Sequence, residues 1–192
     1  AAYMQVPVAI TVEGANILTR SLIVFGQGAI RCHPYVLKEM HAAREPDRAR
    51  ASLAFDAALT GHLRFALTSF ARTFVMGLTG SHFVGVPANI APRTRRYYQQ
   101  LTRFSSALAF VADVSMGTLG GALKRKEKLS ARLGDILSLL YLSSAALKQF
   151  EAQGRHSADE PLLHWAMWDA MFKAQNAFEG VLANFPIRFV AV

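Results

Sequence analysis

The chain has 192 residues, 52% of them hydrophobic and 18% charged, and its 21 Lys and Arg residues against 13 Asp and Glu residues give a formal net charge of +8. This apolar content excludes an intrinsically disordered chain, because such chains lack the side chains that build a core. The single cysteine, Cys32, excludes an intrachain disulfide framework and a four-cysteine zinc site, and it favours a reducing compartment.

The N-terminal part of the chain begins with an apolar, β-prone segment at residues 6–12, and its proline restricts that segment to an edge or an extended position. Asn16 is a good N-cap residue, and the apolar residues behind it recur at helical spacing. We therefore predict a helix from Asn16 that ends at Pro34. A short amphipathic turn then reaches Arg44.

A longer helix is predicted to begin at Pro46-Asp47 and to end near Gly77, since large apolar residues recur through it at helical spacing. The charge-free run 73–92 has about the length of a membrane span. It contains three glycines and two prolines, however, so it would make a poor continuous helix in lipid. We interpret this run as a loop.

Three further helical runs follow this loop, at residues 95–123, 129–153 and 161–184. Their connections, residues 124–128 and 154–160, are short enough to place sequential helices side by side and antiparallel. The predicted fold class is therefore all-α, with a helical front segment followed by an antiparallel helical bundle.

Histidine and carboxylate residues are the candidates for a metal site or a catalytic site. The sequence has no His-Glu-x-x-His motif and no paired Glu-x-x-His motif, so we predict that no metal is bound. His62, His82 and His164 are interpreted as hydrogen-bonded structural or surface residues.

Three carboxylates, Asp113, Asp135 and Asp169, interrupt apolar helices, and each is expected to have a partner because an isolated buried charge is costly. Arg132 lies one turn before Asp135, and Lys173 lies one turn after Asp169. A catalytic carboxylate cluster is the alternative interpretation.

Basic residues form two groups, which we predict to make one basic end of the bundle that docks on an anionic surface. The residues are Arg93, Arg95, Arg96, Lys124, Arg125, Lys126 and Lys128. Nothing near them is typical of base recognition, so nucleic acid is not expected as a partner. A solvated surface that keeps the protein soluble is the simpler alternative.

One segment is more specific than these patterns: residues 9–20, with the sequence AITVEGANILTR. It resembles the active-site segment of acyl-CoA dehydrogenases, in which an apolar or aromatic residue, Glu, Gly and usually Thr enter a helix of the C-terminal domain near the flavin. Residues 23–37, 96–99 and 120–135 resemble blocks of the large bacterial long-chain enzymes of fatty-acid β-oxidation. The resemblance extends to Pro186 and so covers nearly the whole chain.

The resemblance implies that Glu13 is the base that removes the pro-R α-proton of a fatty acyl-CoA, while the β-hydrogen leaves as hydride to FAD and trans-2-enoyl-CoA forms. The backbone N–H of Glu13 would donate to the thioester carbonyl. An apolar setting makes a carboxylate a stronger base, whereas the helix start behind it favours the anion. Gly14, Ala15 and Asn16 would lie near the cofactor or the substrate, and Ala15 replaces the usual Thr. The plain alternative is a Glu-Gly turn before an Asn-capped helix.

The same resemblance implies a division of the chain into two parts. Residues 1–92 would be the end of a catalytic C-terminal helical domain, and residues 93–192 a bacterial-type C-terminal helical bundle. The family also needs an N-terminal helical domain and a middle β-domain, so we expect this chain to be a fragment of a longer protein and to be inactive alone.

Cofactor and partners also follow from the resemblance: FAD in the full-length parent, a fatty acyl-CoA substrate, and electron-transfer flavoprotein or another electron acceptor. Homo-oligomerisation is left open. We expect a cytoplasmic location, with peripheral attachment to the inner membrane as an open alternative. The rival hypothesis is a non-enzymatic helical interaction module that docks on an anionic membrane or an acidic partner.

Overall fold

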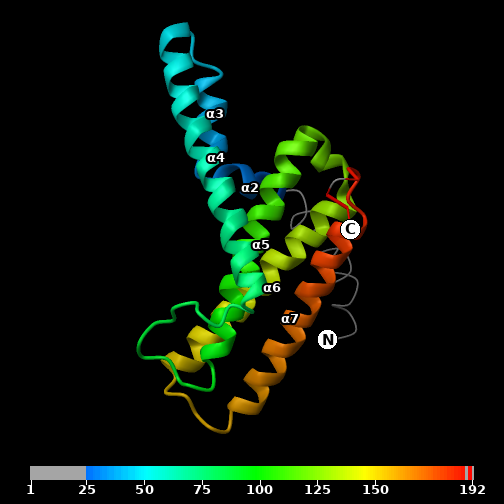
Figure 1. Cartoon of the computed structure of the whole chain (residues 1–192). Coiled ribbons are helices and arrows are strands. Elements are labelled where there is room, and N and C mark those ends of the chain that lie inside the picture. The colour runs from blue at the N-terminus through cyan, green and yellow to red at the C-terminus, as the bar shows by residue number, and fades with distance from the viewer. Residues whose placement is uncertain (1–24, 189, 192) are drawn as a thin grey trace, which may run out of the picture.

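A computed structural model describes residues 25–188 and 190–191, and these residues form helices with no strand among them (Figure 1). The helices are α2 (Gly28–Cys32), α3 (Val36–Ala42), α4 (Arg48–Leu78), α5 (Arg95–Leu119), α6 (Glu127–Ala152) and α7 (Glu160–Ala183), with the 3-10 helix η2 (Gly120–Arg125) between α5 and α6. The predicted all-α class is confirmed. The β-prone segment 6–12 and the helix start at Asn16 lie outside the described residues.

Local signals set the start of the long helix α4. The Asp47 carboxylate accepts the backbone N–H groups of Ala49 at 2.9 Å and Arg50 at 3.3 Å, which is the geometry of an N-cap. The predicted helix end near Gly77 is confirmed, since α4 ends at Leu78, and the start of the run 73–92 is therefore helical and not part of the loop. A run without charges does not stop a helix; the chain turns only at Gly80, whose φ of +55° is left-handed.

The bundle helices follow the prediction with one correction. The run 95–123 does not stay α-helical to its end, because Gly120 adopts a φ of +49° and the chain tightens into η2. The α6 and α7 helices lie within two residues of the predicted bounds at each end, and Pro161 lies in the first turn of α7 as expected.

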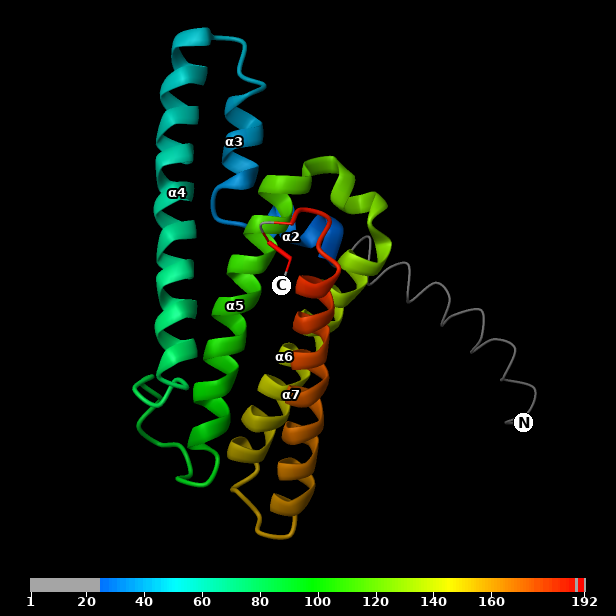
Figure 2. The ribbon, with the colours of Figure 1, turned by 45° about the vertical axis from the view of Figure 1, so that its right-hand side comes forward.

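The hydrophobic core lies between α5, α6 and α7, which run alongside one another as sequential antiparallel neighbours (Figure 2). Five of its large apolar side chains are almost fully buried: Leu133, Ile136, Leu147, Met167 and Val181. Phe104 of α5 stacks on Phe178 of α7 with ring centroids 5.9 Å apart. By length and composition alone residues 95–125 are apolar enough to cross a membrane, but here they pack against α4 and α6 as a bundle helix does.

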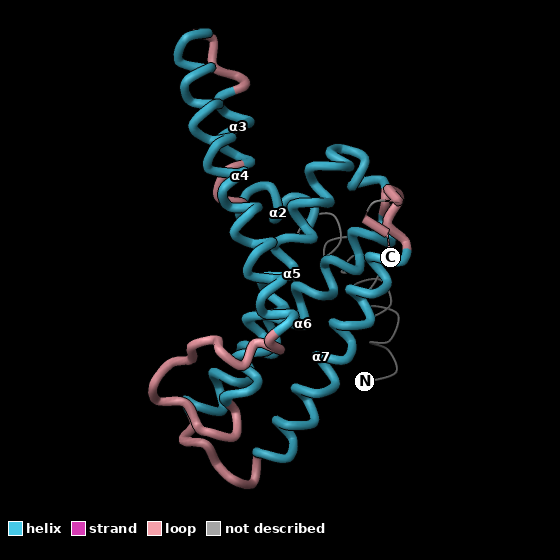
Figure 3. Tube along the Cα trace, in the orientation of Figure 1, coloured by secondary structure: helices cyan, strands magenta, loops and turns pink. Residues whose placement is uncertain are grey.

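The loops 79–94 and 153–159 lie together at one end of the bundle (Figure 3). Glu151 joins them, since its carboxylate accepts the hydroxyl of Thr94 at 2.9 Å and the backbone N–H of Ala91 at 3.3 Å. Arg155 donates both to Glu151, at 2.5 Å, and to the carbonyl of Asn89. This polar contact holds two successive turns of the bundle in place.

The helices α3 and α4 form an arm that extends beyond the bundle, with only the second half of α4 lying along α5 (Figures 1 and 2). Although α4 has 31 residues, it buries only Ala58, Ser69 and Met76. Many of its large apolar side chains are exposed: Leu53, Phe55, Leu59, Leu63, Leu67, Phe70, Phe74, Val75 and Leu78. The described residues leave this face of the arm uncovered.

Candidate functional site

The predicted catalytic segment, Glu13 with Gly14, Ala15 and Asn16, lies outside the described residues. Its proposed roles remain predictions. The candidate site within the described part of the chain is therefore built from other residues.

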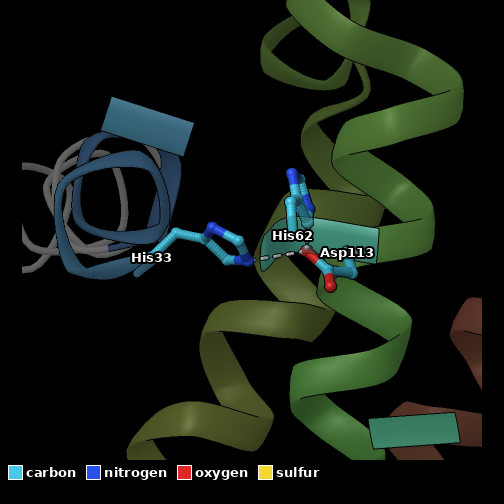
Figure 4. A group of neighbouring side chains, drawn as sticks. All are labelled: His33, His62 and Asp113. Carbon is cyan, nitrogen blue, oxygen red and sulfur yellow. Dashed lines mark hydrogen bonds and ion pairs between the residues drawn. The ribbon is translucent and has the colours of Figure 1, made fainter. Parts of the chain in front are cut away.

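A largely buried cluster of titratable side chains lies where the arm meets the bundle, with Asp113 buried and the other members half-buried. His33 comes from the turn between α2 and α3, Glu39 from α3, His62 from α4 and Asp113 from α5. Figure 4 shows the rings of His33 and His62 converging on the carboxylate of Asp113 from different elements. The side chains of His33 and Asp113 are only 7% and 5% exposed.

The protonation of His33 follows from its backbone neighbours. Its Nδ1 accepts the N–H groups of Tyr35 at 3.2 Å and Val36 at 3.1 Å, so the ring caps the start of α3 and cannot carry a proton on that nitrogen. The proton of the neutral ring is therefore on Nε2, which lies 2.9 Å from Asp113 Oδ1, although the N–H is poorly aligned with that oxygen. Burial lowers the pKa of His33 against the opposing attraction of Asp113, which favours this neutral form.

His62 has the opposite character because both of its ring nitrogens face carboxylates. Nδ1 lies 2.7 Å from Glu39 Oε1 and Nε2 lies 3.3 Å from Asp113 Oδ1. Burial alone would lower the pKa of His62, but the hydrogen bonds to Glu39 and Asp113 outweigh it and the pKa is raised. A doubly protonated His62 can donate to both carboxylates at once.

The cluster resembles a metal-ligand set, since ligand atoms of His33, His62 and Asp113 lie within 4.8 Å of one another. A metal would need the lone pair of His33 Nε2, yet that nitrogen carries the proton while Nδ1 accepts two backbone N–H groups. The arrangement favours a hydrogen-bonded ion-pair network instead. The absence of a bound metal stays a prediction, and this proton arrangement supports it.

The sequence indicates that His62 and Asp113 have polar partners, but it does not indicate that they meet in one cluster. The predictions that Asp113 has partners and that His62 is hydrogen-bonded are confirmed. The helices α4 and α5 bring together residues far apart in the chain, since 51 positions separate His62 from Asp113. No spacing rule links positions so distant, so only the packing of α4 on α5 reveals that they meet.

Other predicted polar partners are local and agree with the structure. Lys173 donates to Asp169 at 2.7 Å, one helical turn away. His164 is hydrogen-bonded, with its Nδ1 at 2.5 Å from the hydroxyl oxygen of Tyr97. The predicted pairing of Asp135 with Arg132 stays a prediction.

The basic residues do not form one end of the bundle, which corrects that expectation. Arg93, Arg95 and Arg96 lie at the start of α5, and residues 124–128 follow its far end. The 25 residues of α5 rise about 1.5 Å each, so about 38 Å of helix separates the two groups. Arg93 also pairs with Glu160 at 2.9 Å, and Arg96 donates to the carbonyl of Gly80 at 2.6 Å. Docking on an anionic surface remains a prediction.

Comparison with known families places these features in context. A family model described as the C-terminal domain of bacterial-type acyl-CoA dehydrogenase matches residues 30–192. The matched range contains α3 to α7 in full, and with them all four members of the buried cluster. No solved structure matches the chain.

Proposed function

Because the chain belongs to the bacterial-type acyl-CoA dehydrogenase C-terminal domain family, we propose that it is part of an FAD-dependent enzyme that oxidises fatty acyl-CoA to trans-2-enoyl-CoA. One observation carries the proposal. A Val-Glu-Gly segment that resembles the active-site segment of acyl-CoA dehydrogenases precedes the matched residues 30–192 in the same chain. The dehydrogenase family and this local motif support each other.

In the proposed reaction the carboxylate of Glu13 takes the α-proton of the acyl thioester. Negative charge then develops on the thioester oxygen, and the backbone N–H of Glu13 donates to it. The chemistry that FAD would supply in the full-length parent is acceptance of the β-hydrogen as hydride. In the sequence Glu13 has the apolar neighbours Val12 and Ala15, and an apolar setting suits a base for a weakly acidic proton.

In this proposal the residues that the structure describes do not carry out the reaction themselves. No FAD contact is assigned to the described residues. FAD would be bound by the other domains that the family has. The acyl-CoA substrate, the electron acceptor and the cytoplasmic location belong to the same proposal.

The substitution Glu13→Gln in the full-length parent tests the proposal. It removes the base and nearly preserves the side-chain volume, so the variant should keep its flavin absorbance and lose both α-proton exchange in D2O and enoyl-CoA formation. Glu179→Gln, an exposed substitution on α7, is the matched control and should retain the activity.

Near-normal turnover by the Glu13→Gln variant would eliminate Glu13 as the base. A parent protein that shows no flavin absorbance and no bleaching by acyl-CoA, but that sediments with liposomes, would favour the rival interaction module. The 192-residue chain by itself should not turn over acyl-CoA.

A further inference from the structure

A basic hollow lies at the end of the bundle where η2 turns into α6. It has a volume of about 460 Å³, and Arg125, Lys126, Lys128 and Arg132 line one side of it. Residues that follow α7, including Asn184, close the other side. Figure 1 shows the turn after α5 beside the red C-terminal residues at this end.

The charge in the hollow is unbalanced. Four cationic side chains line it against a single acid, Glu127. Among the described residues, no ion pair joins Arg125, Lys126 or Lys128 to a carboxylate, in contrast to Arg93 at the other end of the bundle, which pairs with Glu160. Like charges held in a concave surface produce a focused positive potential, and that potential attracts a compact anion.

One of these cations, Arg132, lies in close contact with α7. An ideal Cβ at Gly180 would lie 2.7 Å from Nε and 3.1 Å from Cδ of Arg132. The side chain of Arg132 therefore lies against Gly180 of α7, and a Cβ at that position would require the arginine side chain to shift. A glycine within a helix is unfavourable for helix stability, so this contact supplies a reason for its presence. The planar guanidinium of an arginine that lines a hollow is suited to bidentate binding of a phosphate.

We propose that this hollow binds a phosphate-bearing ligand, with the Arg132 guanidinium and the ammonium groups of Lys126 and Lys128 around the phosphate oxygens. A diphosphate suits it better than a single carboxylate, because four cations gather in one space. The phosphate can belong to a soluble ligand, as in the diphosphate of CoA, or to a lipid headgroup. The inference rests on the geometry of the hollow and stands whether or not Glu13 is a catalytic base.

Titration of the 192-residue chain with inorganic pyrophosphate, followed by calorimetry, tests the site. Binding should weaken as salt rises, because the contacts are charge pairs. The double variant Lys126→Gln with Lys128→Gln should bind about tenfold more weakly. The control variant Arg64→Gln with Lys148→Gln removes the same charge elsewhere and should bind like the wild type.

A second pair of variants tests whether pyrophosphate binding depends on the position of Arg132 or only on the total positive charge. Gly180→Ala changes no charge but displaces Arg132, so it should weaken pyrophosphate binding by about threefold or more. Gly117→Ala is the control, because a Cβ there meets nothing within 4 Å. Circular dichroism of each variant checks that the helices are retained.

Sedimentation with phosphatidylglycerol vesicles, compared with phosphatidylcholine vesicles, identifies the source of the phosphate. If the wild type binds both phosphatidylglycerol vesicles and pyrophosphate, and the Lys126→Gln and Lys128→Gln variant binds neither, the phosphate site is open to lipid. If the wild type binds pyrophosphate but not vesicles, the ligand is soluble. Equal binding by the wild type and both double variants, or no binding by any of them, would overturn the proposal. Unchanged binding by Gly180→Ala would overturn the role of Arg132.

Discussion

The bundle of α5, α6 and α7 and the arm of α3 and α4 contain similar apolar residues but bury them to different extents. In the bundle Leu147 and Met167 are fully buried. In the arm Leu53 and Leu78 are each 74% exposed, and α4 buries no leucine or phenylalanine among its 31 residues. Local helical pattern is present in both regions; only the bundle has neighbouring helices on enough sides to form a core.

The arm is joined to the bundle by a contact of another kind. His62 on α4 and Asp113 on α5 meet in the ion-pair cluster, and His33 and Glu39 connect α3 to the same point. The bundle is therefore stabilised mainly by buried apolar area, and the arm depends more on a polar network. Substitutions in the two regions should have different effects on the folded chain.

The largest expected effect comes from the bundle core. Leu147→Ala leaves a cavity in a fully buried site and should lower the free energy of unfolding by about 3 kcal/mol. The side chain of Leu67 on α4 is 68% exposed, so Leu67→Ala should change the free energy of unfolding by less than about 0.5 kcal/mol. Urea denaturation followed by circular dichroism measures both. Equal losses would mean that the arm face is covered in solution.

A smaller loss is expected when the polar network is broken. Asp113→Ala removes the acceptor shared by His33 and His62 and should cost about 2 kcal/mol. Asp169→Ala, which breaks the exposed pair with Lys173, should cost less than about 0.5 kcal/mol. Amide hydrogen exchange should show that the Asp113→Ala variant loses protection first in α3 and α4. Uniform loss of protection over the bundle would contradict the division into arm and bundle.

The smallest effect is a dependence of stability on pH that arises in the cluster. The raised pKa of His62 adds stability that is complete below 6.5 and is lost as pH rises through the folded-state value. The lowered pKa of His33 adds stability that is present above 6.5 and is lost as pH falls through its folded-state value. Stability of the arm should therefore be greatest near pH 6.5.

Thermal melts between about pH 5 and pH 8.5 measure this dependence. The pH is changed in steps of about half a unit around the ordinary pKa of histidine. His62→Gln should remove the loss on the alkaline side and leave the loss on the acidic side. His82→Gln is the control for a histidine outside the cluster. An unchanged alkaline loss in the His62→Gln variant would show that another group causes it.

The sequence alone determined the features that depend on a few neighbouring residues. Asp47 marks the start of α4 because an N-cap acts within one turn, and Pro161 marks the start of α7 for a similar reason. Asp169 and Lys173 pair because residues four apart share a helix face. The dehydrogenase family was also visible in a short local motif, and the match over residues 30–192 supports it.

Only the tertiary structure decided which distant residues meet. Packing of α4 on α5 brings His62 to Asp113, and the length of α5 separates basic groups that the sequence suggested were together. The same packing buries Leu147 and leaves Leu67 exposed, although both lie in helices of similar pattern. Helix spacing specifies a face, but burial of that face depends on which other helix is placed against it.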